Sequence, residues 1–200
     1  SVGICDVTTL GKIDVQGADA AAFLNKVYCN GFAKLDVGKT RYGLMLREDG
    51  IAMDDGTAAR LAEDHFVVTT TTANAVSVYR HMEFVRQVLS PDMDVQLIST
   101  TESWAQYAVA GPNARNLLRK IVDAEFDISN EAFPFMACGA ITVCGGLRAR
   151  LFRISFSGEL AYEIAVPTRY GDAMIRALVE AGEEFGGCAY GSEALGVMRI

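Results

Sequence analysis

The sequence lacks the features that mark several functional classes. Its 18 lysines and arginines are outnumbered by 25 aspartates and glutamates, which gives a net charge of −7. This balance argues against sequence-independent nucleic-acid binding, which needs a basic surface to displace phosphate counterions. No apolar run approaches the roughly 18 residues of a membrane span, and the first residues lack the basic and apolar regions of a signal peptide. We therefore expect no nucleic acid and no membrane as partners, and a cytoplasmic protein.

Metal ligands and disulfide patterns are also scarce. The 2 histidines, His65 and His81, lie far apart, and neither is near a cysteine at ligand spacing. The cysteines number 5, an odd count, and never form a Cys-x-x-Cys pair: Cys5, Cys29, Cys138, Cys144 and Cys188. Scattered cysteines in an odd number indicate reduced thiols more than a disulfide framework. The sequence predicts no metal site.

The composition is typical of a globular protein, and the sequence contains an internal repeat. The 200 residues are 50% hydrophobic and 22% charged, enough for one large or two small cores. A strand, a tight turn and a helix occur once around Gly17 and again around Gly111. Aligning the two glycines superposes Val15 on Val109, Ala20 on Ala114, Leu24 on Leu118 and Lys26 on Lys120. The repeat predicts two similar halves, residues 1–100 and 101–200.

The remaining segments predict the fold class. The repeated units predict strands at residues 11–16 and 107–110 and helices at 18–28 and 115–122. We expect further strands at residues 42–46, 51–53, 65–69, 94–99, 141–143, 147–156 and 160–166. Two further helices are expected at residues 73–89 and 168–181. Hairpin strands mixed with helices indicate antiparallel sheets with helices on one side. We predict an α+β fold made of two similar split β-α-β halves.

The segment RYGLMLREDGIAMDD carries candidate chemistry, because it reads as two strands around a turn at Gly50 and ends on Asp54 and Asp55. Side chains alternate along a strand, so at most one of the two acids enters a pocket. The plain alternative is that Asp54, Asp55 and Gly56 form a second polar turn.

A second carboxylate occupies the matching place in the other half. Asp55 lies five residues after Gly50, and Glu163 lies five residues after Gly158. Each half therefore offers one acid. If the repeat is a pseudo-twofold, the two acids lie near the boundary between the halves, where ligand sites are common.

Five segments together resemble the aminomethyltransferase (glycine cleavage T-protein) family over essentially all 200 residues. They are CDVTTLGKIDVQGADAAAFLNKV, RYGLMLREDGIAMDDG, AVAGPNA, SFSGELAYEIAVP and GSEALGVMRI. The chain is particularly similar to the folate-binding region of the alpha subunits of heterotetrameric sarcosine oxidases. The resemblance implies a tetrahydrofolate site at which the one-carbon unit from sarcosine oxidation, an imine or formaldehyde, is captured as 5,10-methylenetetrahydrofolate.

The resemblance also implies partners and cofactors. The other sarcosine oxidase subunits are the expected protein partners. The C-terminal barrel domain of the family is absent from these 200 residues, and nothing resembles a dinucleotide fingerprint. FAD, FMN and NAD are therefore expected elsewhere in the full enzyme.

Site residues follow from the matched motifs. The family's folate-contacting aspartate falls on the pair Asp54 and Asp55, with Asp55 preferred from its spacing to Tyr42, which matches a tyrosine of the pterin pocket. Glu163 matches the acid that hydrogen-bonds the pterin ring. The other matches are Tyr162, Arg199, Phe156 in place of a tyrosine, and Thr69 in place of an asparagine.

Two other functions remain open. A true glycine-cleavage aminomethyltransferase would need a lipoyl carrier protein, but Cys5 to Gly11 reads CDVTTLG where that family usually reads Asp-Val-Ser-His-Met. A non-catalytic scaffold for subunit assembly is the third possibility, and the retained Tyr42, Asp55 and Glu163 argue against it.

Overall fold

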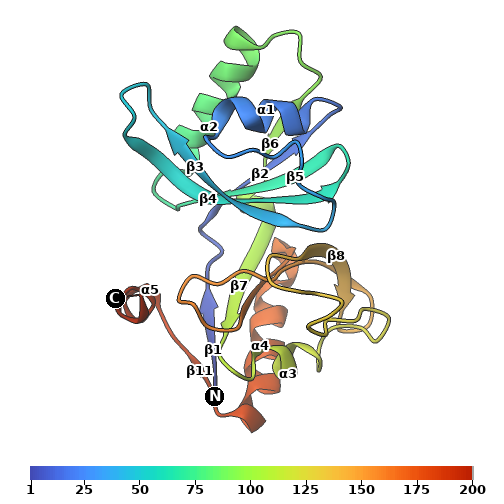
Figure 1. Cartoon of the computed structure of the whole chain (residues 1–200). Helices are drawn as coiled ribbons and strands as arrows, with labels where there is room; N and C mark the ends of the chain where they lie inside the picture. Colours follow the sequence, from blue (N-terminus) through green and yellow to red (C-terminus); the bar gives the residue numbers. More distant parts are fainter. Residues whose placement is uncertain (200) are drawn as a thin grey trace. The chain divides into compact units, whose positions relative to one another are not determined.

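A computed structural model describes residues 1–199 of the chain, which divides into two compact units (Figure 1). We call Thr9–Glu102 the inserted unit, and Ser1–Thr8 together with Ser103–Ile200 the flanking unit. The sequence predicted the halves 1–100 and 101–200. The difference lies mainly at the start of the chain, because the first strand pairs with a strand of the second half.

The inserted unit is one sheet covered on one face by helices. Its strand order is β3-β4-β5-β2-β6, and all neighbours are antiparallel. The strands are β2 (Gly11–Gln16), β3 (Thr40–Leu46), β4 (Ala52–Ala62), β5 (His65–Thr70) and β6 (Gln96–Ser99), and the helices are α1 (Ala20–Val27) and α2 (Ala75–Phe84), continued by a π-helical turn at Val85–Leu89. Strand β2 shows why one face is covered: Ile13 and Val15 join the core with the helices, while Lys12 and Asp14 lie on the other face.

The flanking unit repeats this plan with one added strand. Its order is β11-β1-β7-β10-β9-β8. The strands are β1 (Val2–Asp6), β7 (Trp104–Ala110), β8 (Cys138–Val143), β9 (Leu147–Phe152), β10 (Ala161–Pro167) and β11 (Gly187–Ala189). The helices are α3 (Ala114–Leu118), α4 (Gly171–Gly182) and α5 (Ser192–Met198), with 3-10 turns at Thr168–Tyr170 and Glu183–Phe185. A further 3-10 turn, Thr101–Ser103, spans the end of the inserted unit and the first residue that follows it. The β1–β11 pair is parallel, so this sheet is not purely antiparallel as the sequence predicted.

The predicted α+β fold with two similar halves is confirmed. Both sheets share one order, with β8-β9-β10-β7-β1 corresponding to β3-β4-β5-β2-β6. Gly17 and Gly111 have φ angles of 133° and 123°, and each lies where a strand turns into a helix. A Cβ at Gly17 would lie 2.2 Å from the carbonyl oxygen of Asp94, and one at Gly111 would lie 2.9 Å from that of Ser1. The same backbone crowding therefore requires glycine in both units.

Several element boundaries differ from the prediction. Strand β4 runs straight through Asp54, Asp55 and Gly56, so these residues are strand and not a second polar turn. Glycine suits this place because a Cβ at Gly56 would lie 2.0 Å from the carbonyl oxygen of Thr69. Strand β9 ends at Phe152, earlier than predicted, and α3 ends at Leu118. Val122, predicted as helical, instead forms a β-bridge.

Candidate functional site

Strand β4 separates the two hairpin carboxylates onto opposite faces of the inserted sheet. Asp54 lies opposite Met45, a core residue, and is only 6% exposed. Its carboxylate accepts hydrogen bonds from Thr71 N at 3.1 Å, Thr71 Oγ1 at 2.6 Å and Asn74 Nδ2 at 3.1 Å. Asp54 thus holds the segment that leads into α2.

This network makes a stability prediction. Asp54→Ala removes the carboxylate that accepts from the partly buried donors of Thr71 and Asn74, and should destabilise the start of α2 by about 2–4 kcal/mol. Amide hydrogen exchange of α2 in the full-length protein measures the effect. Asp55→Ala, one residue away on the other face, is the matched control and should change this exchange little. Equal exchange in the two variants would show that Asp54 does not anchor α2.

Tyr28 adds to the environment of Asp54 on the helix-covered face. Burial raises the pKa of the Tyr28 phenol, and the nearby charge of Asp54 raises it further. The ring packs against Gly43, where a Cβ would lie 2.9 Å from Tyr28 Cδ1. Asp54 therefore faces a neutral phenol and a packed core.

Asp55 lies on the helix-free face of the inserted sheet with other candidate residues. It is opposite Leu44, and two residues along the strand pair Tyr42 is opposite Thr57, so these side chains share one face. Thr69 extends the group: its Oγ1 accepts from Thr57 N at 3.0 Å and lies 2.8 Å from Thr57 Oγ1. The structure therefore brings Asp55, Tyr42 and Thr69 onto one surface, with the Tyr42 side chain about half exposed.

Sequence reasoning missed two charged residues on this helix-free face. Lys12, opposite Thr69, is 1% exposed, and its Nζ donates to the carbonyl oxygen of Leu10 at 2.8 Å. Asp14 lies 3.1 Å from His65 Nε2 and accepts from Thr100 Oγ1 at 3.1 Å. Their signal was present in the sequence, because charged residues alternate with Ile13 and Val15 along β2.

Glu163 occupies the helix-free face of the flanking sheet. On β10 it lies opposite Ala108 of β7 and Phe152 of β9. The side-chain Nε2 of Gln106 donates a hydrogen bond to Glu163 Oε2. Glu163 is therefore a partly buried carboxylate with one fixed amide neighbour.

Two weakly acidic side chains, the Cys5 thiol and the Tyr190 phenol, lie close enough to Glu163 to interact with its charge. Burial raises the pKa of the Cys5 thiol, and the charges of Asp6 and Glu163 raise it further. Burial also raises the pKa of Tyr190 to about 12, with smaller contributions from Cys5, Glu163 and Cys188. Because both groups remain protonated near neutral pH, they add no charge beside Glu163.

Tyr162 lies on the opposite face of β10 from Glu163. It is fully buried, its ring stacks on Phe133 at 6.5 Å, and its hydroxyl accepts from Arg115 Nε at 2.7 Å. Adjacent residues of a strand point to opposite faces. The structure therefore does not bring Tyr162 together with Glu163, and its contacts are those of a core residue.

Phe156 and Arg199 form a pair in the flanking unit. Arg199 Cζ lies 4.1 Å from the centre of the Phe156 ring, a cation–π geometry. Phe156 is 50% exposed in the loop between β9 and β10, and Arg199 is the first residue after α5. A tyrosine hydroxyl is missing at position 156, but the aromatic face that holds the arginine is present.

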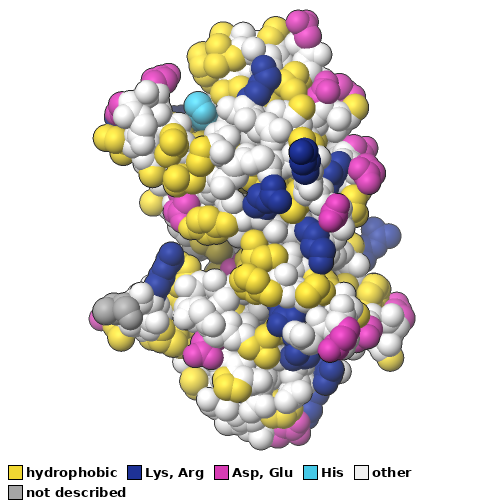
Figure 2. Space-filling model, in the orientation of Figure 1, with side chains coloured by type: hydrophobic (Ala, Val, Ile, Leu, Met, Phe, Trp, Pro, Cys, Tyr) yellow, Lys and Arg dark blue, Asp and Glu magenta, His cyan; other side chains and the backbone are white. Residues whose placement is uncertain are grey.

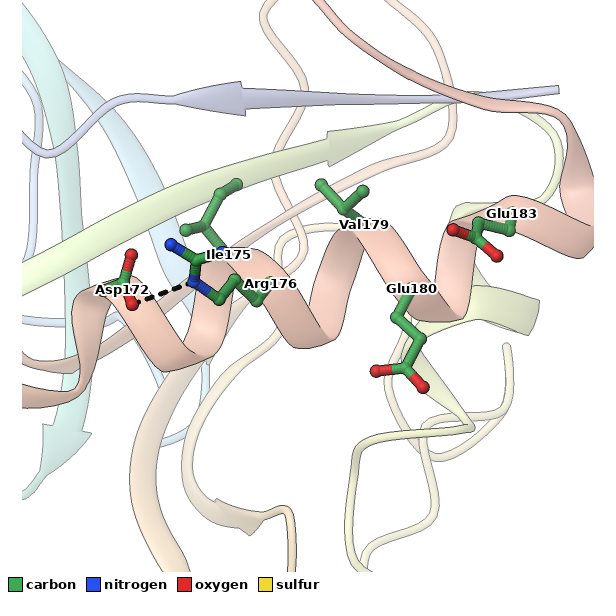
Figure 3. A pocket seen from close by; sticks show the side chains of 6 residues that line it. All are labelled: Asp172, Ile175, Arg176, Val179, Glu180 and Glu183. Atoms are coloured by element: carbon green, nitrogen blue, oxygen red, sulfur yellow. Dashed lines mark hydrogen bonds and ion pairs between the residues drawn. The ribbon is translucent and has the colours of Figure 1, made fainter.

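The surface shows two other features. Basic side chains are interspersed with acidic and apolar ones on the face drawn in Figure 2. An open groove follows α4 (Figure 3), and its lining residues are Asp172, Ile175, Arg176, Val179, Glu180 and Glu183. None of the residues predicted for the site lies in this groove.

Residues 1–199 contain no group of three or more histidine, cysteine, aspartate or glutamate side chains placed to hold a metal ion. Within the same residues, no helix combines the length and the apolar character needed to cross a membrane.

The chain is built from two sheets of the same plan, and each sheet presents a carboxylate on its helix-free face. Comparison with known proteins gives its family. The chain belongs to the GCVT N-terminal domain family, which matches residues 1–200. It is 59% identical over 201 residues to sarcosine oxidase subunit alpha of Rhizobium meliloti (strain 1021), a match covering 100% of this chain and 20% of that relative. It is 30% identical over 201 residues to the aminomethyltransferase of Chloroherpeton thalassium (strain ATCC 35110 / GB-78), covering 100% of this chain and 53% of that relative.

Solved structures share the fold. The crystal structure of glycine cleavage system aminomethyltransferase T from Bartonella henselae matches with a TM-score of 0.83 and 25% identity, covering 99% of this chain and 50% of that chain. A chain of heterotetrameric sarcosine oxidase from Corynebacterium sp. U-96, in complex with pyrrole 2-carboxylate, matches with a TM-score of 0.70 and 16% identity. The match covers 94% of this chain and 86% of that chain. The chain spans about a fifth of the length of its sarcosine oxidase relatives and about half that of the aminomethyltransferases.

Proposed function

We propose that this chain is the tetrahydrofolate-binding part of a sarcosine oxidase alpha subunit, where the one-carbon unit released from sarcosine is captured as 5,10-methylenetetrahydrofolate. The observation that carries the proposal is the Glu163 carboxylate, presented on a helix-free face with Gln106 beside it. The identity to sarcosine oxidase alpha subunits supports this assignment.

Glu163 suits recognition of a pterin. A pterin ring presents neighbouring N–H donors on one edge, and an ionised carboxylate has two oxygens that accept them side by side. Hydrogen bonds to a charged group contribute about 1.5–3 kcal/mol each. Gln106 donates to Oε2 of Glu163, and an ionised carboxylate offers about four acceptor positions in all.

Asp55 suits the chemical step. Tetrahydrofolate supplies the nitrogens that take up the one-carbon unit. A carboxylate beside them accepts the proton that is released and stabilises a cationic one-carbon imine electrostatically. Asp55 shares its face with Tyr42 and Thr69, whereas the oxygens of Asp54 are taken by Thr71 and Asn74. This difference supports the choice of Asp55.

The polar and aromatic side chains of the described residues fit a folate, and the sequence carries no dinucleotide-binding fingerprint. Carboxylates, hydroxyls and exposed aromatic rings line the helix-free faces and the loop at Phe156. The turns at Gly17 and Gly111 lack the glycine-rich phosphate-binding pattern. FAD, FMN and NAD therefore belong to other parts of the full enzyme in this proposal, and the other sarcosine oxidase subunits are its protein partners.

Calorimetric titration of tetrahydrofolate into the full-length protein, kept free of oxygen, tests the proposal. We expect saturable binding, and 5,10-methylenetetrahydrofolate as the product when sarcosine is oxidised in its presence. Absence of binding would contradict the folate assignment.

The structural match to aminomethyltransferase T favours a second candidate, aminomethyl transfer from a lipoyl carrier. Activity with an aminomethyl-lipoyl carrier protein and none with sarcosine would establish that function instead.

A further inference from the structure

Tyr190 follows the short strand β11, and its ring lies on the helix-free face of the flanking sheet. Val2 and Ile4 of β1 point into the core with the helices, so Gly3 between them faces the other way. A Cβ added at Gly3 would lie 2.7 Å from Cε1 and 2.8 Å from Cδ1 of Tyr190. The ring of Tyr190 therefore rests against Gly3, on the same face of the sheet as Glu163.

Small side chains occupy the strand between this ring and Glu163. Gly3 pairs with Ala110 across β1 and β7, and Glu163 pairs with Ala108 across β10 and β7. Both alanines lie on the helix-free face and are only partly buried. The surface over β7 is therefore low and open between the ring of Tyr190 on one side and Glu163 on the other.

The phenol of Tyr190 offers a hydrogen-bond donor at this surface. The backbone N–H of Tyr190 donates to the carbonyl oxygen of Ile4 at 3.0 Å, which holds the residue beside β1. Within residues 1–199 the hydroxyl makes no hydrogen bond, and the side chain is partly exposed. Because burial raises the pKa of Tyr190 to about 12, the hydroxyl keeps its proton near neutral pH. The flanking sheet thus presents a neutral O–H donor on the face that carries Glu163.

We propose that Tyr190 is a specificity-determining residue of the folate site, whose hydroxyl donates a hydrogen bond to the carbonyl oxygen at C4 of the pterin ring. The proposal rests on the proposed function, because it concerns the same site. The pterin edge that carries N–H donors also carries this carbonyl, which needs a donor from the protein. An ionised carboxylate cannot supply a donor, whereas a protonated phenol can. Tyr190 therefore complements the acceptor of the ring edge whose donors Glu163 recognises.

Tyr190→Phe separates the hydroxyl from the ring, because phenylalanine keeps the contact with Gly3 and loses only the O–H donor. We expect the dissociation constant of tetrahydrofolate for the full-length protein to rise about three- to tenfold. The comparison ligand is an analogue of tetrahydrofolate with hydrogen in place of the C4 oxygen. Its dissociation constant should change by less than about twofold, because it lacks the acceptor. Any change in its contact with Glu163 is the same in both proteins and cancels from the comparison.

Gly3→Ala tests the position of the ring without removing the hydroxyl. The added Cβ displaces the ring, so tetrahydrofolate should bind about three- to tenfold more weakly here too. In the double variant the two losses should not add, because each substitution removes the same hydrogen bond. Tyr170→Phe, at an exposed tyrosine just before α4, is the matched control and should bind both ligands as wild type does.

The outcomes separate this inference from the proposed function. If wild type does not bind tetrahydrofolate, the proposed function itself fails. If wild type binds it, a larger loss for tetrahydrofolate than for the analogue in Tyr190→Phe supports the inference. Unchanged binding of tetrahydrofolate by Tyr190→Phe, or an equal loss for both ligands, would show that the hydroxyl does not recognise the C4 carbonyl and would overturn the role of Tyr190.

Discussion

Asp55→Asn in the full enzyme is expected to leave sarcosine oxidation largely intact while the one-carbon unit leaves as free formaldehyde. Oxidation and capture occur at separate sites in the proposed function, so only capture depends on this carboxylate. Asparagine keeps the shape of the side chain but loses the charge that accepts a proton and stabilises a cationic imine. Loss of a general base lowers the rate of such a step by roughly 10² to 10⁴. Formaldehyde and 5,10-methylenetetrahydrofolate should both be quantified at saturating folate.

Asp54→Asn is the parallel variant for this experiment. Asp54 lies on the helix-covered face, so its asparagine variant should keep the wild-type ratio of products, although it weakens the network with Thr71 and Asn74. Diversion in the Asp54 variant, with none in the Asp55 variant, would assign the chemistry to the other carboxylate. An unchanged ratio of formaldehyde to 5,10-methylenetetrahydrofolate in both variants would show that neither Asp54 nor Asp55 takes part in the capture step.

Local patterns in the sequence predicted much of the fold. The alternation of Ile13 and Val15 correctly predicted the bounds of β2 and the face that packs against the helices, and the glycine repeat identified Gly17 and Gly111 as equivalent turns. Both signals are local, since alternation and positive φ each depend on a few neighbouring residues. This is why the two-half α+β plan is predictable from one sequence.

Features that depend on long-range pairing could not be predicted in this way. Strand β1 takes beside β7 the place that β6 takes beside β2, although β1 precedes the whole inserted unit in the chain. The five residues of β1 do not by themselves specify the strand with which β1 pairs. The contact of Gln106 with Glu163 likewise depends on the register of β7 against β10, which no single segment specifies.

Some predictions about the site could have been sharper from the sequence alone. Tyr162 and Glu163 are adjacent in a strand, so alternation already implies that they face opposite ways. The motif match retained both residues, because a match in sequence does not distinguish a ligand contact from a core position. The pairing of Arg199 with Phe156, by contrast, joins a helix end to a loop and is visible only in the folded unit.

Glu163→Ala is expected to weaken tetrahydrofolate binding by about 2–4 kcal/mol, because it leaves the donors of the bound ring without a charged acceptor. At roughly 1.4 kcal/mol for each tenfold change, the dissociation constant should rise by about 30- to 1,000-fold. Glu159→Ala is the matched control, since Glu159 is an exposed acid four residues earlier, and it should bind as wild type does. Titration calorimetry on the full-length protein measures both variants. An unchanged dissociation constant for Glu163→Ala would exclude this carboxylate from the folate site, and an equal loss in both variants would indicate a nonspecific effect of charge.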